Sequence, residues 1–270
     1  MDDFRGLVRA FARPADELCN IAGPGCPYTL PVGGQPLIAR AVTALCDAGA
    51  KQILVALDSS IAEAVAGAVP EPEGAEVHIA IQADGDDDAT MRAVDKTFGP
   101  GPLLFTAADA LVADSARDEV TAGQQVVELR ASWRYDGTVD GVLNANTIAL
   151  DGLKRGRVGA DLSTASIQGR VHVDASAELD GAKLRGPVFI GPGARLVETY
   201  VGPYTTVGAG VTLEGVEIEH SIVLPEAEIR YPGRRLEASL VGEGAQISRD
   251  YSLPSALRLR VGPGSEIQLS

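Results

Sequence analysis

The sequence predicts an α/β protein in which a doubly wound parallel sheet is followed by a parallel β-helix. Short apolar runs alternate with amphipathic stretches in the first half, and aliphatic residues recur at a seventeen-residue spacing in the second. We expect an α/β domain over residues 1–153 and a β-helix over residues 165–270. A chain of 270 residues is long enough for two domains, each with its own core.

The first half alternates predicted strands with predicted helices. Helical spacing of apolar residues covers 36–48, 61–69 and 89–98, and Ser60 and Asp88 are the expected N-caps of the last two helices. Open sheets of this kind bind ligands at the carboxyl ends of their strands, so functional side chains are expected just after each strand. The four predicted strands, short and apolar as for strands covered on both faces, are Leu7–Val8, Ile53–Leu57, Val77–Ile81 and Leu103–Phe105.

The second half contains a repeat whose coil has three short sides. Coils of this kind bury their apolar faces only by stacking on one another, so the repeated aliphatic residues should form one continuous core. The motif returns at 261–267 after a register shift, where we expect the closing strand. The repeated positions are Val173, Leu179 and Leu184, then Ile190, Leu196 and Val201, then Val207, Leu213 and Ile218, continuing to Leu224 and Val241.

Composition excludes several classes of function. A net charge of −14 and a pI near 4.6, without a basic cluster, argue against a nucleic-acid partner. No apolar run approaches the roughly 18 residues of a membrane span, and the first residues do not resemble a secretion signal, so we expect a cytoplasmic protein without membrane contact. The three cysteines lack metal-site spacing and are expected to be reduced thiols.

Several segments together carry a family resemblance over nearly the whole chain. They are Leu30-Pro-Val-Gly-Gly-Gln-Pro-Leu-Ile38, the strand in 102–111 that leads to Asp109, 126–150, Ile218-Glu-His-Ser-Ile-Val-Leu224 and 256–262. These segments resemble the long form of glucose-1-phosphate thymidylyltransferases, within the sugar-1-phosphate nucleotidylyltransferases. The resemblance implies a Rossmann-like nucleotidyltransferase sheet followed by a left-handed β-helix.

The family's phosphate-binding loop is not matched. In the family a Gly-x-Gly-Thr-Arg segment follows the first strand, because backbone N–H groups must approach the phosphates closely. Here Phe11-Ala-Arg-Pro-Ala15 follows that strand without a glycine, and Ala15 or Asp16 stands at the place of the catalytic arginine. Arg13 is a candidate substitute that would contact a ligand. Pro27-Tyr28 stands where the family has a lysine, and Tyr28 is a further candidate site residue.

The resemblance gives half of a metal site. Asp109 aligns with the family's first magnesium carboxylate and would bind Mg²⁺ if a nucleotide site survives. Tyr135 aligns with the second, and Asp136 follows one residue later, which on an extended segment places it on the opposite face. Gln82 and Gly85 fall near the family's base-reading glutamine and glycine. Only about fifteen residues connect Asp109 to Gln125, so the family's sugar-binding lobe is missing.

These losses favour a homologue that no longer carries out sugar-1-phosphate nucleotidylyl transfer and serves a binding, assembly or pathway role. By family analogy we expect a homo-oligomer. A second hypothesis is a repurposed enzyme of bacterial specialised metabolism that binds a small molecule at the opened sheet edge. A third is residual NDP-sugar formation. The residues that would line the opened edge are Tyr28, Asp109, Trp133, Tyr135, Asp136 and Cys26.

Overall fold

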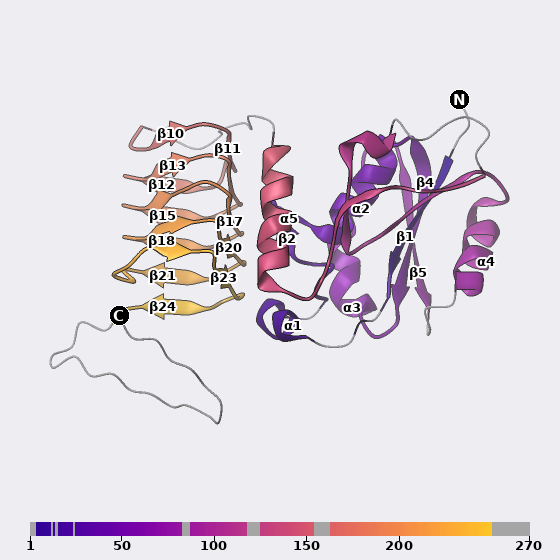
Figure 1. Cartoon of the computed structure of the whole chain (residues 1–270), viewed down its shortest axis with the longest axis horizontal. Coiled ribbons are helices and arrows are strands. Elements are labelled where there is room, and N and C mark those ends of the chain that lie inside the picture. Colours follow the sequence, from indigo (N-terminus) through magenta and orange to yellow (C-terminus); the bar gives the residue numbers. More distant parts are fainter. Residues whose placement is uncertain are drawn as a thin grey trace, which may run out of the picture.

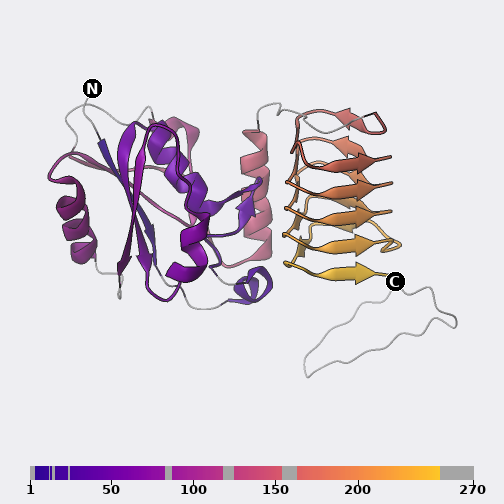
Figure 2. The same ribbon diagram turned by 180° about the vertical axis from the view of Figure 1, so that it is seen from behind.

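The computed structural model describes residues 4–11, 13, 16–23, 25–82, 87–117, 125–153 and 163–249. An α/β layer lies beside a stack of β-helix coils, as Figures 1 and 2 show from opposite sides. The first sheet is parallel throughout, with strand order β5-β4-β1-β6-β8. The predicted parallel sheet is therefore confirmed. Its strands are β1 (Phe4–Ala10), β4 (Ala50–Asp58), β5 (Glu76–Gln82), β6 (Leu103–Ala107) and β8 (Val126–Glu128).

Helices cover both faces of this sheet. On one face α2 (Leu37–Asp47) and α3 (Ala62–Val65), which continues into η1 (Ala66–Ala68), share an apolar cluster with Ile53 and Val55. On the other face α4 (Asp87–Phe98) packs against Leu54 through Val94. Alternate residues of β4 thus point to opposite helical layers, which explains why the strand is apolar without interruption over Ile53–Leu57.

Both predicted N-caps are wrong. The helix after Ser60 begins at Ala62 without a side-chain cap, because the Ser60 hydroxyl donates a hydrogen bond to Asp58 Oδ1 at 2.6 Å. Asp88 lies within the first turn of α4, which already begins at Asp87.

The remaining elements of the first half lie beside the sheet rather than in it. They are the short helix α1 (Glu17–Ala22), the two-stranded hairpin β2 (Pro31–Val32) and β3 (Gln35–Pro36), the antiparallel pair β7 (Ala110–Val112) and β9 (Ala131–Arg134), the turn η2 (Asp114–Arg117) and the helix α5 (Val139–Asp151).

The second half forms three five-stranded parallel sheets, which fit a left-handed β-helix. The aliphatic residues of successive coils stack in one core, with Val173, Ile190 and Val207 in register. The first sheet consists of β10 (Ser166–Gln168), β13 (Lys183–Arg185), β16 (Tyr200–Val201), β19 (Glu217–Glu219) and β22 (Leu236–Glu237). The second consists of β11 (Val171–Val173), β14 (Val188–Ile190), β17 (Thr205–Val207), β20 (Ile222–Val223) and β23 (Leu240–Val241). The third consists of β12 (Glu178–Asp180), β15 (Arg195–Val197), β18 (Thr212–Glu214), β21 (Glu228–Arg230) and β24 (Gln246–Ser248).

The predicted register fails at one coil. Val207 pairs with Val223 rather than Leu224, because the corner between β19 and β20 is one residue shorter than the repeat. Leu224 instead joins an apolar cluster with residues of the first half. Val223 pairs with Val241, so the next coil is longer and returns Val241 to the core. The closing strand expected at 261–267 lies outside the described residues.

The two halves meet where the β11-β14-β17-β20-β23 sheet faces α5 (Figure 1). Asn146 of α5 is fully buried there, and its Oδ1 accepts hydrogen bonds from Gly33 N at 2.8 Å and Thr206 Oγ1 at 2.7 Å. Its Nδ2 donates to the carbonyl of Tyr204 at 2.9 Å. Gly34, with φ of +84°, approaches so closely that a Cβ would lie 2.5 Å from the Phe189 ring. One asparagine therefore joins the hairpin, α5 and the β-helix.

None of the helices in the described part of the chain is long and apolar enough to cross a lipid bilayer.

We expect Asn146→Ala to destabilise the protein by roughly 2–4 kcal/mol, because it removes the side-chain partner of three polar groups, one in the hairpin and two in the β-helix. Asn144→Ala is the matched control, since Asn144 is exposed on the same helix and the change has the same effect on helix propensity. Urea unfolding of both variants measures the difference. Equal midpoints would show that Asn146 does not hold the junction.

Candidate functional site

Polar side chains gather at the carboxyl edge of the parallel sheet. Asp58 ends β4, Asp109 follows β6 by two residues, and Arg13 follows β1 by three. Because parallel strands end at the same edge, residues distant in sequence are brought together there. The turn at 25–29 adds Tyr28, whose pKa responds to the charges of Asp109, Arg13 and Asp58. We call Arg13, Tyr28, Asp58 and Asp109 the edge cluster.

An ion pair lies at the centre of the edge cluster. Arg13 Nη2 is 3.0 Å from Asp109 Oδ2. Asp109 is a buried residue with 13% of its side chain exposed, whereas 42% of the Arg13 side chain is exposed. The Arg13 guanidinium carbon also lies 5.4 Å from the centre of the Tyr135 ring, within cation–π range. The chain therefore neutralises the Asp109 carboxylate with its own cation.

Tyr28 is hydrogen-bonded to the residue that directly follows β1. Its buried hydroxyl donates a hydrogen bond to the carbonyl of Phe11 at 2.5 Å. Burial, and next the negative charge of Asp109, raise the pKa of Tyr28 well above the ordinary value for tyrosine. Tyr28 is thus a neutral hydrogen-bond donor at physiological pH and does not act as a base.

Tyr135 is also a hydrogen-bond donor. Its hydroxyl donates to Asp16 Oδ2 at 2.8 Å, and the sulfur atoms of Cys19 and Cys26 each lie 3.9 Å from the same oxygen. Burial and the hydrogen bond to Asp16 raise the pKa of Tyr135. Asp16 Oδ1 caps α1 by accepting from Cys19 N at 2.8 Å. Burial would raise the pKa of Asp16, but the hydrogen bonds from Cys19 and Tyr135 outweigh it and lower this pKa.

Other residues predicted for the site have different surroundings. Asp136 is exposed, and its Oδ1 accepts hydrogen bonds from Thr138 N at 3.0 Å and Thr138 Oγ1 at 2.8 Å at the start of α5. Trp133 is buried in the apolar cluster at the junction, edge-to-face with Tyr135 at 6.4 Å. These contacts give Asp136 and Trp133 structural roles.

The base-reading pair is only partly described. Gln82 ends β5 at the same edge, two strands from β1, and its Oε1 accepts a hydrogen bond from Thr90 at 2.8 Å. Gly85 lies outside the described residues. The ligand-binding roles of Gln82 and Gly85 stay predictions.

Sequence reasoning did not name Asp58 or Cys19 as site residues, and it noted Asp16 only as standing near the place of the family's arginine. Asp58 could have been predicted from the sequence, because this residue directly follows an apolar strand and therefore lies at the carboxyl edge. The link between Asp16 and Tyr135 joins residues 119 positions apart, and no periodic pattern signals such a contact.

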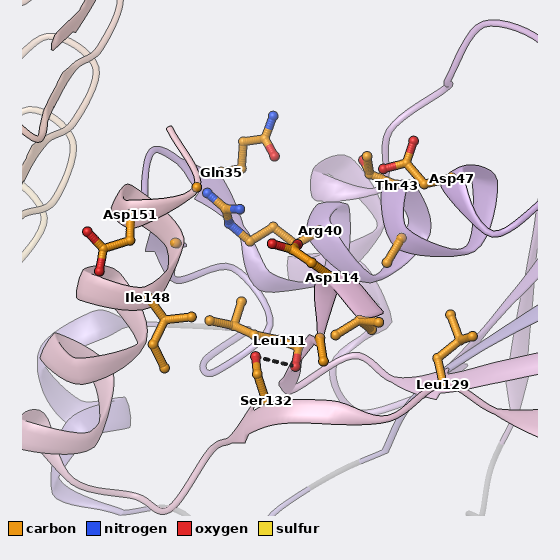
Figure 3. A pocket seen from close by; sticks show the side chains of 15 residues that line it. Gln35, Arg40, Thr43, Asp47, Leu111, Asp114, Leu129, Ser132, Ile148 and Asp151 are labelled. Atoms are coloured by element: carbon orange, nitrogen blue, oxygen red, sulfur yellow. Dashed lines mark hydrogen bonds between the residues drawn. The ribbon is translucent and has the colours of Figure 1, made fainter. Parts of the chain in front are cut away.

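Two cavities lie away from the edge cluster. One, of about 780 Å³, lies between α2, β7 and α5, and its rim carries Asp47, Asp114 and Asp151 (Figure 3). Arg40 extends into it from α2 and donates to the carbonyls of Val32 at 2.6 Å and Gly33 at 3.1 Å, and burial lowers its pKa to about 10. The second, of about 410 Å³, lies between the hairpin and the β-helix and is mostly apolar.

The residues at the two predicted metal positions do not fit a magnesium site as they stand. Mg²⁺ at phosphate sites is usually held by one or two carboxylates together with phosphate oxygens and water. Asp109 is paired with Arg13, and Tyr135, at the second position, donates its hydroxyl proton to Asp16. We therefore assign no chemistry through a metal at this edge.

No protein-family model matches the chain, but three curated proteins are similar to it. Glucose-1-phosphate thymidylyltransferase of Streptomyces griseus is 33% identical over 161 residues, which are 59% of this chain and 45% of that protein. The protein of the same name from Streptomyces antibioticus is 30% identical over 179 residues, 66% of this chain and 48% of that protein. Over these regions the chain is similar in sequence to two glucose-1-phosphate thymidylyltransferases.

The third relative extends this finding beyond the thymidylyltransferases. The low-salt glycan biosynthesis nucleotidyltransferase Agl11 of Haloferax volcanii is 38% identical over 143 residues, 51% of this chain and 39% of that protein. The relationship predicted from the sequence motifs is thus confirmed. The matched region covers about half the length of these relatives or less.

The raised pKa of Tyr28 predicts a loss of stability at alkaline pH. Above about pH 10 the unfolded chain releases the Tyr28 proton while the folded chain keeps it, so the free energy of unfolding falls as pH rises. Tyr28→Phe should cost about 1 kcal/mol at neutral pH through the lost hydrogen bond, yet reduce this alkaline slope. Urea unfolding between about pH 8 and 11 measures both effects. Parallel slopes for wild type and variant would contradict the prediction.

Proposed function

We propose that this chain is a nucleotidyltransferase homologue that does not transfer nucleotidyl groups to sugar 1-phosphates and that acts instead through binding or assembly. The observation that carries the proposal is the Arg13–Asp109 ion pair at 3.0 Å. Asp109 aligns with the family's first magnesium carboxylate, and an internal guanidinium already compensates its charge. A metal ion would have to displace that cation before it could bind a nucleotide.

The second metal position supports the same proposal. Tyr135 stands there, and its hydroxyl is a donor whose proton is directed at Asp16. Burial keeps this phenol neutral, so it adds no negative charge for a divalent cation. Asp136 instead accepts hydrogen bonds from Thr138, the N-cap residue of α5.

The phosphate-binding turn gives independent support. Residues 11–16 contain no glycine and include Pro14, so they offer fewer backbone N–H groups for close approach to phosphates than the family's loop. Tyr28 stands where the family has a lysine and binds the carbonyl of Phe11. Tyr28 lacks the positive charge with which a lysine stabilises a transferred phosphoryl group, and its hydroxyl proton is already donated to Phe11.

Self-association is the assembly role that we infer by family analogy. Two of the three β-helix sheets do not face α5, and their outward residues form ion pairs such as Arg195–Glu178 at 3.1 Å and Arg235–Glu219 at 2.8 Å. A homo-oligomer would use one of these two faces. Analytical ultracentrifugation of the full chain measures whether one forms.

Calorimetric titration with dTTP, UTP, CTP and GTP, each with magnesium, tests the loss of nucleotidyl transfer. We expect no binding heat and no pyrophosphate release when glucose 1-phosphate is added. The thymidylyltransferase of Streptomyces griseus serves as the positive control. Binding and pyrophosphate release that Asp109→Asn abolishes, and Asp114→Asn in the separate cavity does not, would overturn the proposal and establish residual NDP-sugar formation.

A double-mutant cycle tests whether the ion pair is formed in solution. We expect Arg13→Ala and Asp109→Asn to show a coupling energy of about 1 kcal/mol, because Asp109 is buried and its charge is poorly hydrated. The exposed Arg195–Glu178 pair is the control and should couple by only a few tenths of a kcal/mol. Urea unfolding of the four proteins in each cycle gives these values. A coupling energy near zero would mean that Asp109 remains available to a metal or a ligand.

A further inference from the structure

Two cysteines approach one another beside the edge cluster. Cys19 lies in α1 and Cys26 in the turn that follows, and their sulfur atoms are each 3.9 Å from the hydroxyl oxygen of Tyr135. Both side chains are partly buried and both are free thiols. The nucleotidyltransferase resemblance gives these thiols no role, and the proposed function does not use them.

Local chain geometry explains why the two thiols meet. Asp16 caps α1 by accepting from Cys19 N, which fixes Cys19 in the first turn of the helix. At the other end, Gly23 N donates to the carbonyl of Cys19 at 3.0 Å, and the chain reverses at Gly23 with φ of +81°. A left-handed conformation of this kind favours glycine. The reversal returns Cys26 to the same hydroxyl that Cys19 contacts.

The surroundings hold the two thiols beside one hydroxyl. The sulfur atoms of Cys19 and Cys26 both contact the Tyr135 hydroxyl oxygen, so a mixed disulfide on one cysteine would lie next to the other thiol. Burial, and next the neighbouring Cys19 thiol, raise the pKa of Cys26 above the ordinary value for cysteine. Since the thiolate is the nucleophile in disulfide exchange, this slows attack by Cys26 on an external reagent, and we place Cys26 as the thiol that resolves the product.

We propose that Cys19 and Cys26 form a reversible intramolecular disulfide with a low-molecular-weight disulfide as the oxidant. The Cys19 thiolate attacks one sulfur of the oxidant, which breaks the oxidant's S–S bond and releases one small thiol. Cys26 then loses its proton and attacks the Cys19 sulfur, which forms the protein S–S bond and releases the second small thiol. The protein gives up two protons and two electrons, and the oxidant takes up the same two protons and two electrons.

The bond would act on the edge cluster. It would join α1, which carries Asp16 at its cap, to the turn that leads to Tyr28. Asp16 holds the Tyr135 hydroxyl and Tyr28 holds the end of β1, so oxidation would fix the segment between these contacts. This modification would couple the redox state of the surroundings to the shape of the sheet edge, whether or not nucleotides bind there.

The chain contains its own control. Cys46, the third cysteine, lies in α2 and packs against the apolar cluster of the sheet, whereas Cys26 packs against the cluster at the junction. Trypsin is expected to place Cys19 and Cys26 on the peptide 10–40 and Cys46 on the peptide 41–51, because Pro14 blocks cleavage after Arg13. The proposed disulfide is therefore internal to a single peptide.

The experiment treats the folded full-length chain with oxidised glutathione and then counts thiols after unfolding. We expect the three thiols to fall to one, and the peptide 10–40 to lose two hydrogens, without a disulfide between chains. The Cys46→Ser variant should still form the disulfide between Cys19 and Cys26, whereas the Cys19→Ser and Cys26→Ser variants should not. Ring closure should be at least about tenfold faster in the folded chain than in urea, because the fold holds the thiols together.

Three results would overturn the proposal. They are a persistent glutathione adduct without ring closure, cross-linking through Cys46 between chains, and equal closure rates in the folded and urea-unfolded chain. Because the mass measurement on the wild-type protein needs no variant, a folding defect in Cys19→Ser or Cys26→Ser leaves the test intact. None of these readouts depends on nucleotide binding, so failure here is separate from failure of the proposed function.

Discussion

A carboxylate buried at the carboxyl end of a parallel strand requires a compensating charge, and Arg13 supplies it to Asp109. Desolvation makes a lone buried carboxylate costly, so some cation, from the chain or from solution, must neutralise it. When the cation belongs to the chain, it is present at all times and cannot leave with a product. The Arg13–Asp109 pair therefore favours a sheet edge whose carboxylate is always neutralised by the protein over an edge that binds a metal ion together with its substrate.

The same edge is held from a second direction by the junction with the β-helix. Trp133 packs into the apolar cluster that reaches the β-helix residues Ile222 and Leu224, and Tyr135, two residues later on the same side, directs its hydroxyl to Asp16. Side chains on an extended segment alternate in direction, so the intervening Arg134 points away and pairs with Glu128 at 2.7 Å. The position of Tyr135 in the site is thus set partly by the packing of the second half of the chain.

The sequence allowed the sheet, the helices on its faces and the stacked coils to be predicted, because burial on two faces or at every corner imposes a repeated apolar pattern. It did not allow the register at Leu224 to be predicted, because the length of one corner is a local property with no effect on hydrophobicity. The antiparallel pair β7 and β9 was also missed, since three or four residues are too few for a period to be recognised. The edge cluster was predicted only as separate residues, because Arg13 and Asp109 lie far apart in the sequence and no periodic pattern signals their ion pair.

One of the segments that resemble the family lies where the two halves of the chain join. The motif 30–38 contains Gly33, whose N–H donates to Asn146, and Gly34, which lies against Phe189. Both glycines are explained by the close approach of the hairpin to α5 and the β-helix, without reference to any ligand. The segment 11–16, whose glycines in the family are required by phosphates, has none. The glycines that folding requires are thus different from the glycines that phosphate binding requires. A chain can therefore lose the phosphate-binding glycines while the glycines at the junction still specify the same architecture.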